Sequence, residues 1–180
     1  MKYGRLIAVC GVMTALSAAF SALERLLPVF ILIPLPGVKL GLANIVTLVA
    51  LFTLGGLPAF CILTARCLLG WFFGGGVTGL LFSLTGGFFA LGVMRLLKRF
   101  CAGGRADTAE NKGFFSLYGV SMAGAAAHNI GQICAAMVLL RSFALLGYLP
   151  VLLIASIATG LITGTMAGGV LKRLRGSKQV

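Results

Sequence analysis

The sequence predicts an all-α, polytopic membrane protein in which six transmembrane helices form one compact domain over residues 1–180. Hydrophobic residues make up 59% of the 180 positions and charged residues 10%, and the mean hydropathy is +1.08. Soluble domains carry about 25% charged and roughly 45–50% apolar residues. Apolar runs close to the roughly 20 residues that a spanning helix needs recur along the whole chain. No separate soluble module is therefore expected.

The first predicted span covers residues 5–27. Lys2 and Arg5 precede its apolar run, which is also the pattern of a signal peptide. We favour a retained helix because the run is long and lacks a clean small-x-small cleavage site. Small residues recur at every fourth position on one face of this helix, namely Gly11, Ala15 and Ala19. Such a flat face lets another helix approach closely, either within the bundle or from a partner protein.

The stretch over residues 24–47 interrupts the apolar pattern. Three of the five prolines occur there, at positions 28, 34 and 36, so residues 28–37 cannot form a continuous helix. Glu24 is the only acid outside the central hydrophilic loop, and Arg25 and Lys39 flank the prolines. We interpret residues 28–37 as a lid loop over the outer mouth of the bundle.

Five further spans follow this lid. Turns rich in glycine and proline separate them at residues 55–58 and 74–76, and a hydrophilic loop over residues 98–113 separates the fourth span from the fifth. A solvated connection explains that loop, to which we assign no chemistry. The predicted ranges of the five spans are 38–54, 58–73, 77–97, 114–140 and 148–171. The last span carries glycines at four-residue spacing, which predicts a second close-packing face at Gly160, Gly164 and Gly168.

The distribution of basic residues predicts the orientation of the chain. With six spans and a cytoplasmic N-terminus, eleven of the fifteen Lys and Arg residues fall inside and three fall outside (Arg25, Lys39 and Arg141), while Arg66 lies within the membrane. Cytoplasmic loops carry the excess of Lys and Arg in membrane proteins. Both termini are therefore expected in the cytoplasm. The net charge of +12 has this explanation rather than binding to nucleic acid.

Polar side chains on four spans converge between the midplane and the outer surface once the alternating direction of the spans is taken into account. Burying Arg66 near the bilayer centre costs at least about 2.5–3.5 kcal/mol, so it needs a partner or a wet cavity. The excess of positive charge favours an anionic or carbonyl-rich ligand, which an arginine would bind in bidentate fashion. The predicted substrate-binding residues are Glu24, Arg25, Lys39, Asn44, Arg66, His128, Asn129 and Gln132.

A purely structural role for these residues is the alternative. His128, Asn129 and Gln132 would then form hydrogen bonds between helices. Glu24 would neutralise Arg66 in the same arrangement. Both explanations place the polar groups in the interior of the bundle.

The residue pattern offers no catalytic group, cofactor site or metal site. His128 has no acid and nucleophile at helical spacing, and the hydroxyl groups of the spans are those of ordinary membrane helices (Ser17, Ser21, Thr47 and Ser83). The five cysteines form no CxxC or Cys/His ligand spacing, so we expect neither a disulfide nor a metal ion. The Walker A pattern GxxxxGK[ST] does not occur, and the chain is therefore not expected to hydrolyse ATP.

The most specific motifs are PGVKLGLANI at 36–45 and HNIGQ at 128–132, together with SLTGG in the fourth span. With them the whole chain resembles the Gx transporter family, which is also described as heptaprenyl diphosphate synthase component I. That family is similar to the S-components of energy-coupling factor (ECF) transporters, six-helix subunits for vitamin uptake in the bacterial cell membrane. The resemblance implies a ligand near the outer surface and a docking face at Gly11, Ala15 and Ala19 for a transmembrane scaffold subunit. It also implies ATPase subunits as further partners.

Two functions are therefore in competition. The first is an S-component-like, substrate-binding subunit for uptake of a small organic molecule that resembles a vitamin or a quinone precursor. The second is a non-catalytic membrane subunit of a heptaprenyl diphosphate synthase or of a related isoprenoid or quinone pathway. Prenyl transfer needs acid clusters that hold Mg²⁺ against a diphosphate, and this chain has three acids, none adjacent to another. Under either function the chain is not an enzyme, and its partners are membrane lipid, protein subunits and a small-molecule ligand.

Overall fold

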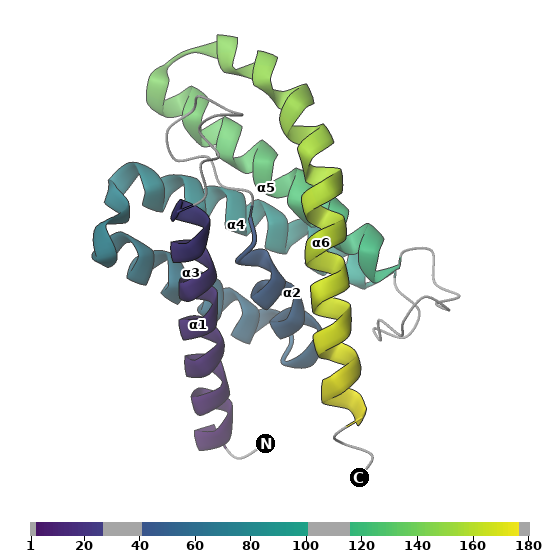
Figure 1. Ribbon diagram of the computed structural model, residues 1–180. Coiled ribbons are helices and arrows are strands. Elements are labelled where there is room, and N and C mark those ends of the chain that lie inside the picture. The colour runs from purple at the N-terminus through teal and green to yellow at the C-terminus, as the bar shows by residue number, and fades with distance from the viewer. Residues whose placement is uncertain (1–2, 27–40, 101–115, 177–180) are drawn as a thin grey trace.

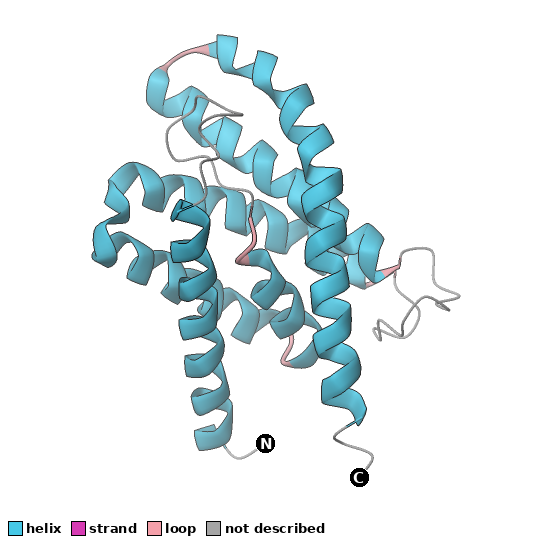
Figure 2. Cartoon of the chain, in the orientation of Figure 1, coloured by secondary structure: helices cyan, strands magenta, loops and turns pink. Residues whose placement is uncertain are grey.

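The computed structural model describes residues 3–26, 41–100 and 116–176, apart from the side chains of residues 25, 175 and 176, and all regular structure in these ranges is helical (Figure 2). A π-helical turn over Trp71–Gly75 follows the third helix, and a 3₁₀ helix over Phe143–Tyr148 precedes the last one. The α-helices, labelled in Figure 1, are α1 (Tyr3–Leu26), α2 (Asn44–Thr53), α3 (Gly56–Gly70), α4 (Gly76–Lys98), α5 (Leu117–Leu140) and α6 (Leu149–Gly176).

Glycines allow α3 and α4 to fold back on each other. The backbone leaves helical geometry inside the π-helical turn, where Gly74 (φ +86°) and the following Gly76 (φ +63°) occupy the left-handed region that glycine adopts without strain. Figure 1 shows α3 and α4 running back along each other from this turn. Three exposed aromatic side chains lie at the turn, as is common where a helix meets a membrane surface: Trp71, Phe72 and Phe73.

Four helical stretches of the described chain are long and apolar enough to cross a membrane. The second of them contains the whole α3–α4 hairpin. The described chain therefore has the dimensions of a membrane-spanning protein, whereas the predicted set of six separate spans is not confirmed. The four stretches are Tyr3–Glu24, Gly56–Lys98, Leu117–Leu140 and Phe143–Leu174.

The second predicted span, over residues 38–54, is not confirmed as a membrane crossing. Residues 41–43 are not helical, and α2 has only ten residues, or about 15 Å of helix. Gly41 (φ +84°) has a left-handed conformation that no continuous helix contains. The other five predicted spans coincide with α1, α3, α4, α5 and α6, apart from ends that move by a few residues. The predicted lid over residues 28–37 and most of the 98–113 loop lie outside the described residues.

The short helix α2 is the buried centre of the bundle. Every residue from Asn44 to Leu51 is buried, and α1, α3 and α6 all pack against this helix. Lys98, at the end of α4, donates a hydrogen bond from Nζ to the Leu51 carbonyl (2.7 Å) and lies over the ring of Phe52 at 5.0 Å. It thereby satisfies one of the carbonyl groups that every helix C-terminus leaves without a partner. A helix too short to span is tolerated at membrane depth when protein surrounds it.

Close packing between α5 and α6 depends on glycine. A Cβ atom at Gly160 of α6 would lie only 2.5 Å from the Cα atom of Met122 on α5. The same face of α6 continues toward α5 with Gly164 and Gly168. The close-packing face predicted from the four-residue spacing is therefore confirmed, since small residues at such positions let two backbones approach.

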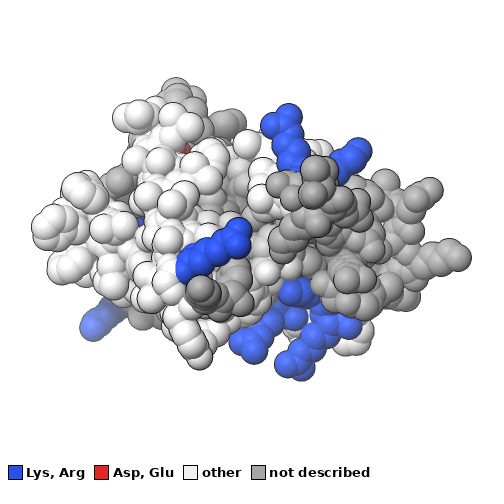
Figure 3. Space-filling view, turned by 90° about the horizontal axis from the view of Figure 1, so that it is seen from below, with Lys and Arg blue, Asp and Glu red and all other residues white. Residues whose placement is uncertain are grey.

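The surface of the bundle is apolar along the helices and basic at one end. Large hydrophobic side chains such as Ile7 and Ile154 are more than two-thirds exposed, at 71% each. Soluble monomers rarely expose apolar patches of such extent, so these faces are suited to lipid. The first turn of α1 and the last turns of α6 lie at the same end of the molecule (Figure 1), where Arg5, Lys172 and Arg173 are exposed. Figure 3 views that end and shows Lys and Arg side chains distributed over it.

Replacement of Gly160 by alanine is expected to destabilise the protein. The added methyl group would meet the Met122 backbone at 2.5 Å, and overpacking of this kind costs about 1–3 kcal/mol. Gly169→Ala is the matched control on the same helix, because nothing lies within 4 Å of its Cβ position and alanine favours a helix by about 1 kcal/mol over glycine. Thermal unfolding in detergent should show a lower midpoint for Gly160→Ala only. Equal midpoints for the two variants would contradict the close α5–α6 contact.

Candidate functional site

Arg66 of α3 is the centre of a buried polar cluster. Its side chain is only 4% exposed. Its Nη1 donates a hydrogen bond to Ser21 Oγ of α1 (3.1 Å), and its Nη2 donates one to Asn44 Oδ1 of α2 (3.4 Å). Both acceptors are neutral, and Nε has no hydrogen-bond partner within the described chain. One guanidinium thus connects three helices, and no carboxylate of the described residues pairs with it.

Glu24 lies one turn beyond Ser21 on α1 and is also buried, at 3% exposure. Its carboxylate accepts a hydrogen bond from the backbone N–H of Gly41, in the turn before α2, rather than from Arg66. A Cβ atom at position 41 would lie 3.0 Å from Asn44 Nδ2 and 3.2 Å from His128 Cδ2. Glycine at this position therefore permits the left-handed backbone and leaves room for Asn44 and His128 to approach.

Helix α5 contributes His128 and Gln132 to the interior. His128 is 2% exposed, and Gln132 is fully buried. A Cβ atom at Gly86 of α4 would lie 2.8 Å from His128 Cε1, and one at Gly131 would lie 2.8 Å from the Thr85 carbonyl oxygen. Helix α4 therefore passes directly against the imidazole ring and fixes its position.

Asn129 has a different neighbour. Its Nδ2 donates a hydrogen bond to the Leu152 carbonyl (2.9 Å), so this side chain links α5 to α6. Of the predicted set, the structure brings Arg66 and Asn44 into contact and places His128 beside Asn44 at Gly41. Within the described residues, no contact joins Asn129 to Arg66.

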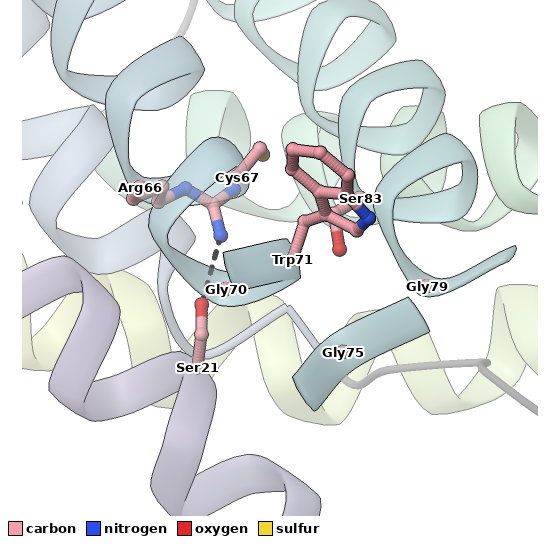
Figure 4. Close-up of a pocket in the computed structure, with 8 residues that line it drawn as sticks. All are labelled: Ser21, Arg66, Cys67, Gly70, Trp71, Gly75, Gly79 and Ser83. Carbon is pink, nitrogen blue, oxygen red and sulfur yellow. Dashed lines mark hydrogen bonds between the residues drawn. The ribbon is translucent and has the colours of Figure 1, made fainter. Parts of the chain in front are cut away.

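A small cavity lies beside Arg66, as Figure 4 shows. Its volume of about 10 Å³ is close to the roughly 10–15 Å³ that a single water molecule requires. In Figure 4 the side chains of Trp71 and Ser83 lie across this space from the guanidinium group. An organic ligand would therefore reach Arg66 only after neighbouring groups move. The lining residues are Ser21, Arg66, Cys67, Gly70, Trp71, Gly75, Gly79 and Ser83.

A larger apolar groove lies between α1 and α6 and has α2 as its floor. Its volume of about 360 Å³ falls within the roughly 300–1,000 Å³ typical of ligand sites. Arg173 is the one charged side chain in its lining, and none of the lining residues belongs to the Arg66 cluster. The lining consists of Met13, Leu16, Phe20, Ile45, Val46, Val49, Thr165, Met166, Gly169, Val170 and Arg173.

Comparison with known protein families assigns the chain to one of them. The family model described as heptaprenyl diphosphate synthase component I matches residues 13–170. The chain belongs to this family. The match confirms the resemblance that the sequence motifs indicated, and it covers the Arg66 cluster and all of the groove except Arg173. No curated protein and no solved structure matched the chain.

Part of the predicted site lies outside the described residues. The side chain of Arg25, all of Lys39 and the 28–37 lid belong to this part, and their roles stay predictions.

The predicted docking face of α1, in contrast, lies within the described residues. Its three residues are exposed, namely Gly11, Ala15 and Ala19. The described bundle leaves this face uncovered, so docking of a partner there stays a prediction as well.

Ser21 is the main residue of the site that sequence reasoning missed, since its hydroxyl group was assigned an ordinary structural role. It accepts a hydrogen bond from Arg66 and lines the same cavity. Its position three residues before Glu24 places both side chains on one face of α1. That spacing was the available signal, because a buried arginine needs acceptors from neighbouring helices.

Removal of the Ser21 hydroxyl group is expected to destabilise the bundle. Ser21→Ala leaves a buried guanidinium donor without its acceptor, and a loss of this kind costs about 1–3 kcal/mol. Thr64→Val is the control on α3, because the Thr64 hydroxyl donates only to the Phe60 carbonyl of its own helix. Unfolding midpoints in detergent should fall for Ser21→Ala and change little for Thr64→Val. If both variants unfold alike, Ser21 does not support Arg66.

Proposed function

We propose that the chain is a non-catalytic membrane subunit that works with a soluble prenyl diphosphate synthase and holds an isoprenoid at the membrane. Its membership of the heptaprenyl diphosphate synthase component I family supports this proposal, because a component implies a partner. Helices of membrane-spanning length support it too, since a polyprenyl chain is itself a membrane-soluble group.

The observation that carries the proposal is the scarcity and separation of the acidic side chains, of which Glu24 is the one in the described bundle. It is the one buried carboxylate of the described residues, and it accepts a hydrogen bond from the Gly41 amide. Asp107 and Glu110, the remaining acids, belong to the hydrophilic loop over residues 98–113. Prenyl transfer requires clustered carboxylates that hold Mg²⁺ against a diphosphate. The partner would therefore supply the catalytic acids, and this chain would supply the membrane site.

The proposal includes a location and an orientation. The chain would lie in the bacterial cell membrane with both termini in the cytoplasm, where a soluble synthase has access. The excess of Lys and Arg in the predicted inner segments supports this orientation. The exposed basic residues at the end shared by α1 and α6 support it as well, since an acidic partner or an anionic membrane surface would bind there.

The full-length chain, tagged and extracted from its host, should copurify with a soluble subunit that carries acid clusters. Native mass spectrometry of the complex should also detect a polyprenyl diphosphate. An unrelated polytopic membrane protein with the same tag is the control, and protease access to the tag in inside-out vesicles checks the orientation. Copurification of ATPase subunits without a synthase would contradict the proposal.

Uptake of a small anionic molecule, by an S-component-like mechanism, is the second candidate. One observation favours it specifically: Arg66 is buried with neutral acceptors only, and its Nε has no described partner. A bound carboxylate or phosphate would supply the missing negative charge. The exposed face at Gly11, Ala15 and Ala19 would dock on a transmembrane scaffold subunit. The ligand would bind among Arg66, Asn44 and His128 after the α3–α4 turn moves.

For this second function, Arg66→Ala and Asn44→Ala are expected to weaken binding of the ligand that native mass spectrometry identifies. Loss of a charge-assisted hydrogen bond corresponds to about a 10- to 100-fold increase in Kd. Asn129→Ala is the matched control, because Asn129 is equally buried but bonds to α6. Calorimetric titration of the purified variants measures the effect. Equal affinity in all three variants would place the ligand elsewhere.

A further inference from the structure

The groove between α1 and α6 combines a hydrocarbon lining with a single cation at one end. Nine of its eleven lining residues are apolar or glycine, and Thr165 and Arg173 are the two polar ones. Thr165 and Arg173 are eight residues apart on α6, which corresponds to about 12 Å along the groove. Arg173 lies at the end of the molecule where α1 begins and α6 ends (Figure 1).

The short length of α2 is the origin of this groove. Both α1 and α6 pack against α2, on either side of it in Figure 1. Because α2 has only ten residues, it supports the two long helices over part of their length. Its side chains Ile45, Val46 and Val49 form the floor between them. The groove lies between two helices of membrane-spanning length, so an apolar chain could enter it sideways from the bilayer.

The size and lining of the groove suit a small apolar group. Its volume of about 360 Å³ lies near the lower end of the roughly 300–1,000 Å³ typical of ligand sites. The lining on α6 extends over about 12 Å, from Thr165 to Arg173. A single hydrocarbon chain can lie along it.

The charged residue at one end of the groove favours a ligand with an anionic head group. Arg173 is exposed and belongs to the lining of the groove, and its long side chain can reach the membrane surface. A guanidinium group binds phosphate with two parallel hydrogen bonds. A single-chain amphiphile with a phosphate head matches both ends.

We infer that the α1–α2–α6 groove binds the chain of a prenyl diphosphate and that Arg173 binds its diphosphate. This inference rests on the proposed function, which supplies the isoprenoid, and adds the place and the manner of binding. The diphosphate then lies at the basic end formed by α1 and α6. A soluble synthase in the cytoplasm would find the head group at that surface while the chain stays in the membrane.

The test uses the purified full-length chain in phosphatidylcholine nanodiscs and a photoactivatable geranylgeranyl diphosphate. Crosslinks are expected on Met13, Val49 or Met166, which line the groove. Arg173→Gln should raise the Kd of the probe about tenfold or more, as expected for loss of a charge-assisted hydrogen bond. Lys172→Gln is the matched control, because it removes the same charge from the adjacent exposed residue outside the lining. Its Kd should stay within about threefold of the wild type.

A second pair of variants tests the groove itself. Gly169→Leu places a large side chain in the lining, and nothing lies within 4 Å of its Cβ position, so the fold tolerates it. Gly92→Leu is the control on α4. Nothing lies within 4 Å of its Cβ position either, and Gly92 does not line the groove. Gly169→Leu should abolish crosslinking at Met13 and Met166, and Gly92→Leu should not.

Three outcomes would overturn the inference. Equal effects of Arg173→Gln and Lys172→Gln would show attraction by general surface charge. Displacement of the probe by an equal amount of phosphatidylglycerol would show a lipid site, and crosslinks confined to other helices would show a different location. Because these measurements use the purified chain alone, they are independent of whether a synthase copurifies. The proposed function and this inference therefore fail in different experiments.

Discussion

A cation buried in an apolar bundle is the constraint on which this structure depends. Arg66 is 4% exposed, and a charge at such depth in a membrane costs at least about 2.5–3.5 kcal/mol unless the protein solvates it. Ser21 and Asn44 supply that solvation from α1 and α2, so the guanidinium determines how three helices meet. Gly41 completes the arrangement, because its left-handed backbone directs an amide to Glu24 and leaves space beside Asn44. A polar interior thus stabilises one half of the bundle.

Glycine packing stabilises the other half. Helices α4, α5 and α6 approach so closely that a single added carbon at Gly160 would meet backbone at 2.5 Å, and a carbon at Gly86 would meet His128. Such contacts supply dispersion energy, which drives helix association in lipid where the hydrophobic effect does not. The two halves meet at α2, whose short length leaves the groove between α1 and α6. Two chemically different cavities result: a compact one beside the cation Arg66 and a larger apolar groove that ends at Arg173.

The candidate site was predictable from the sequence to the extent that its members are costly in a membrane. Arg66, Asn44 and His128 stand out because apolar spans rarely contain such groups, and the structure places them in one interior region. Asn129 has the same composition signal, yet its amide bonds to the Leu152 carbonyl, because its position on α5 turns it toward α6. Ser21 carries almost no signal, since a serine is common in membrane helices. The groove carries none, because ordinary apolar residues of three separate helices form it.

The sequence by itself determined the membrane class and the helical architecture, because composition and apolar run length reflect the solvent in which a chain folds. Its motifs indicated the family. It also determined the packing face of α6, since glycine spacing is a local property. Only the tertiary structure decided that α2 is a buried ten-residue helix rather than a continuous helix over residues 38–54. The reason is that Gly41 takes its left-handed conformation beside Glu24 of α1 and His128 of α5, which are distant from it in sequence. Contacts of that kind leave no periodic pattern from which they can be predicted.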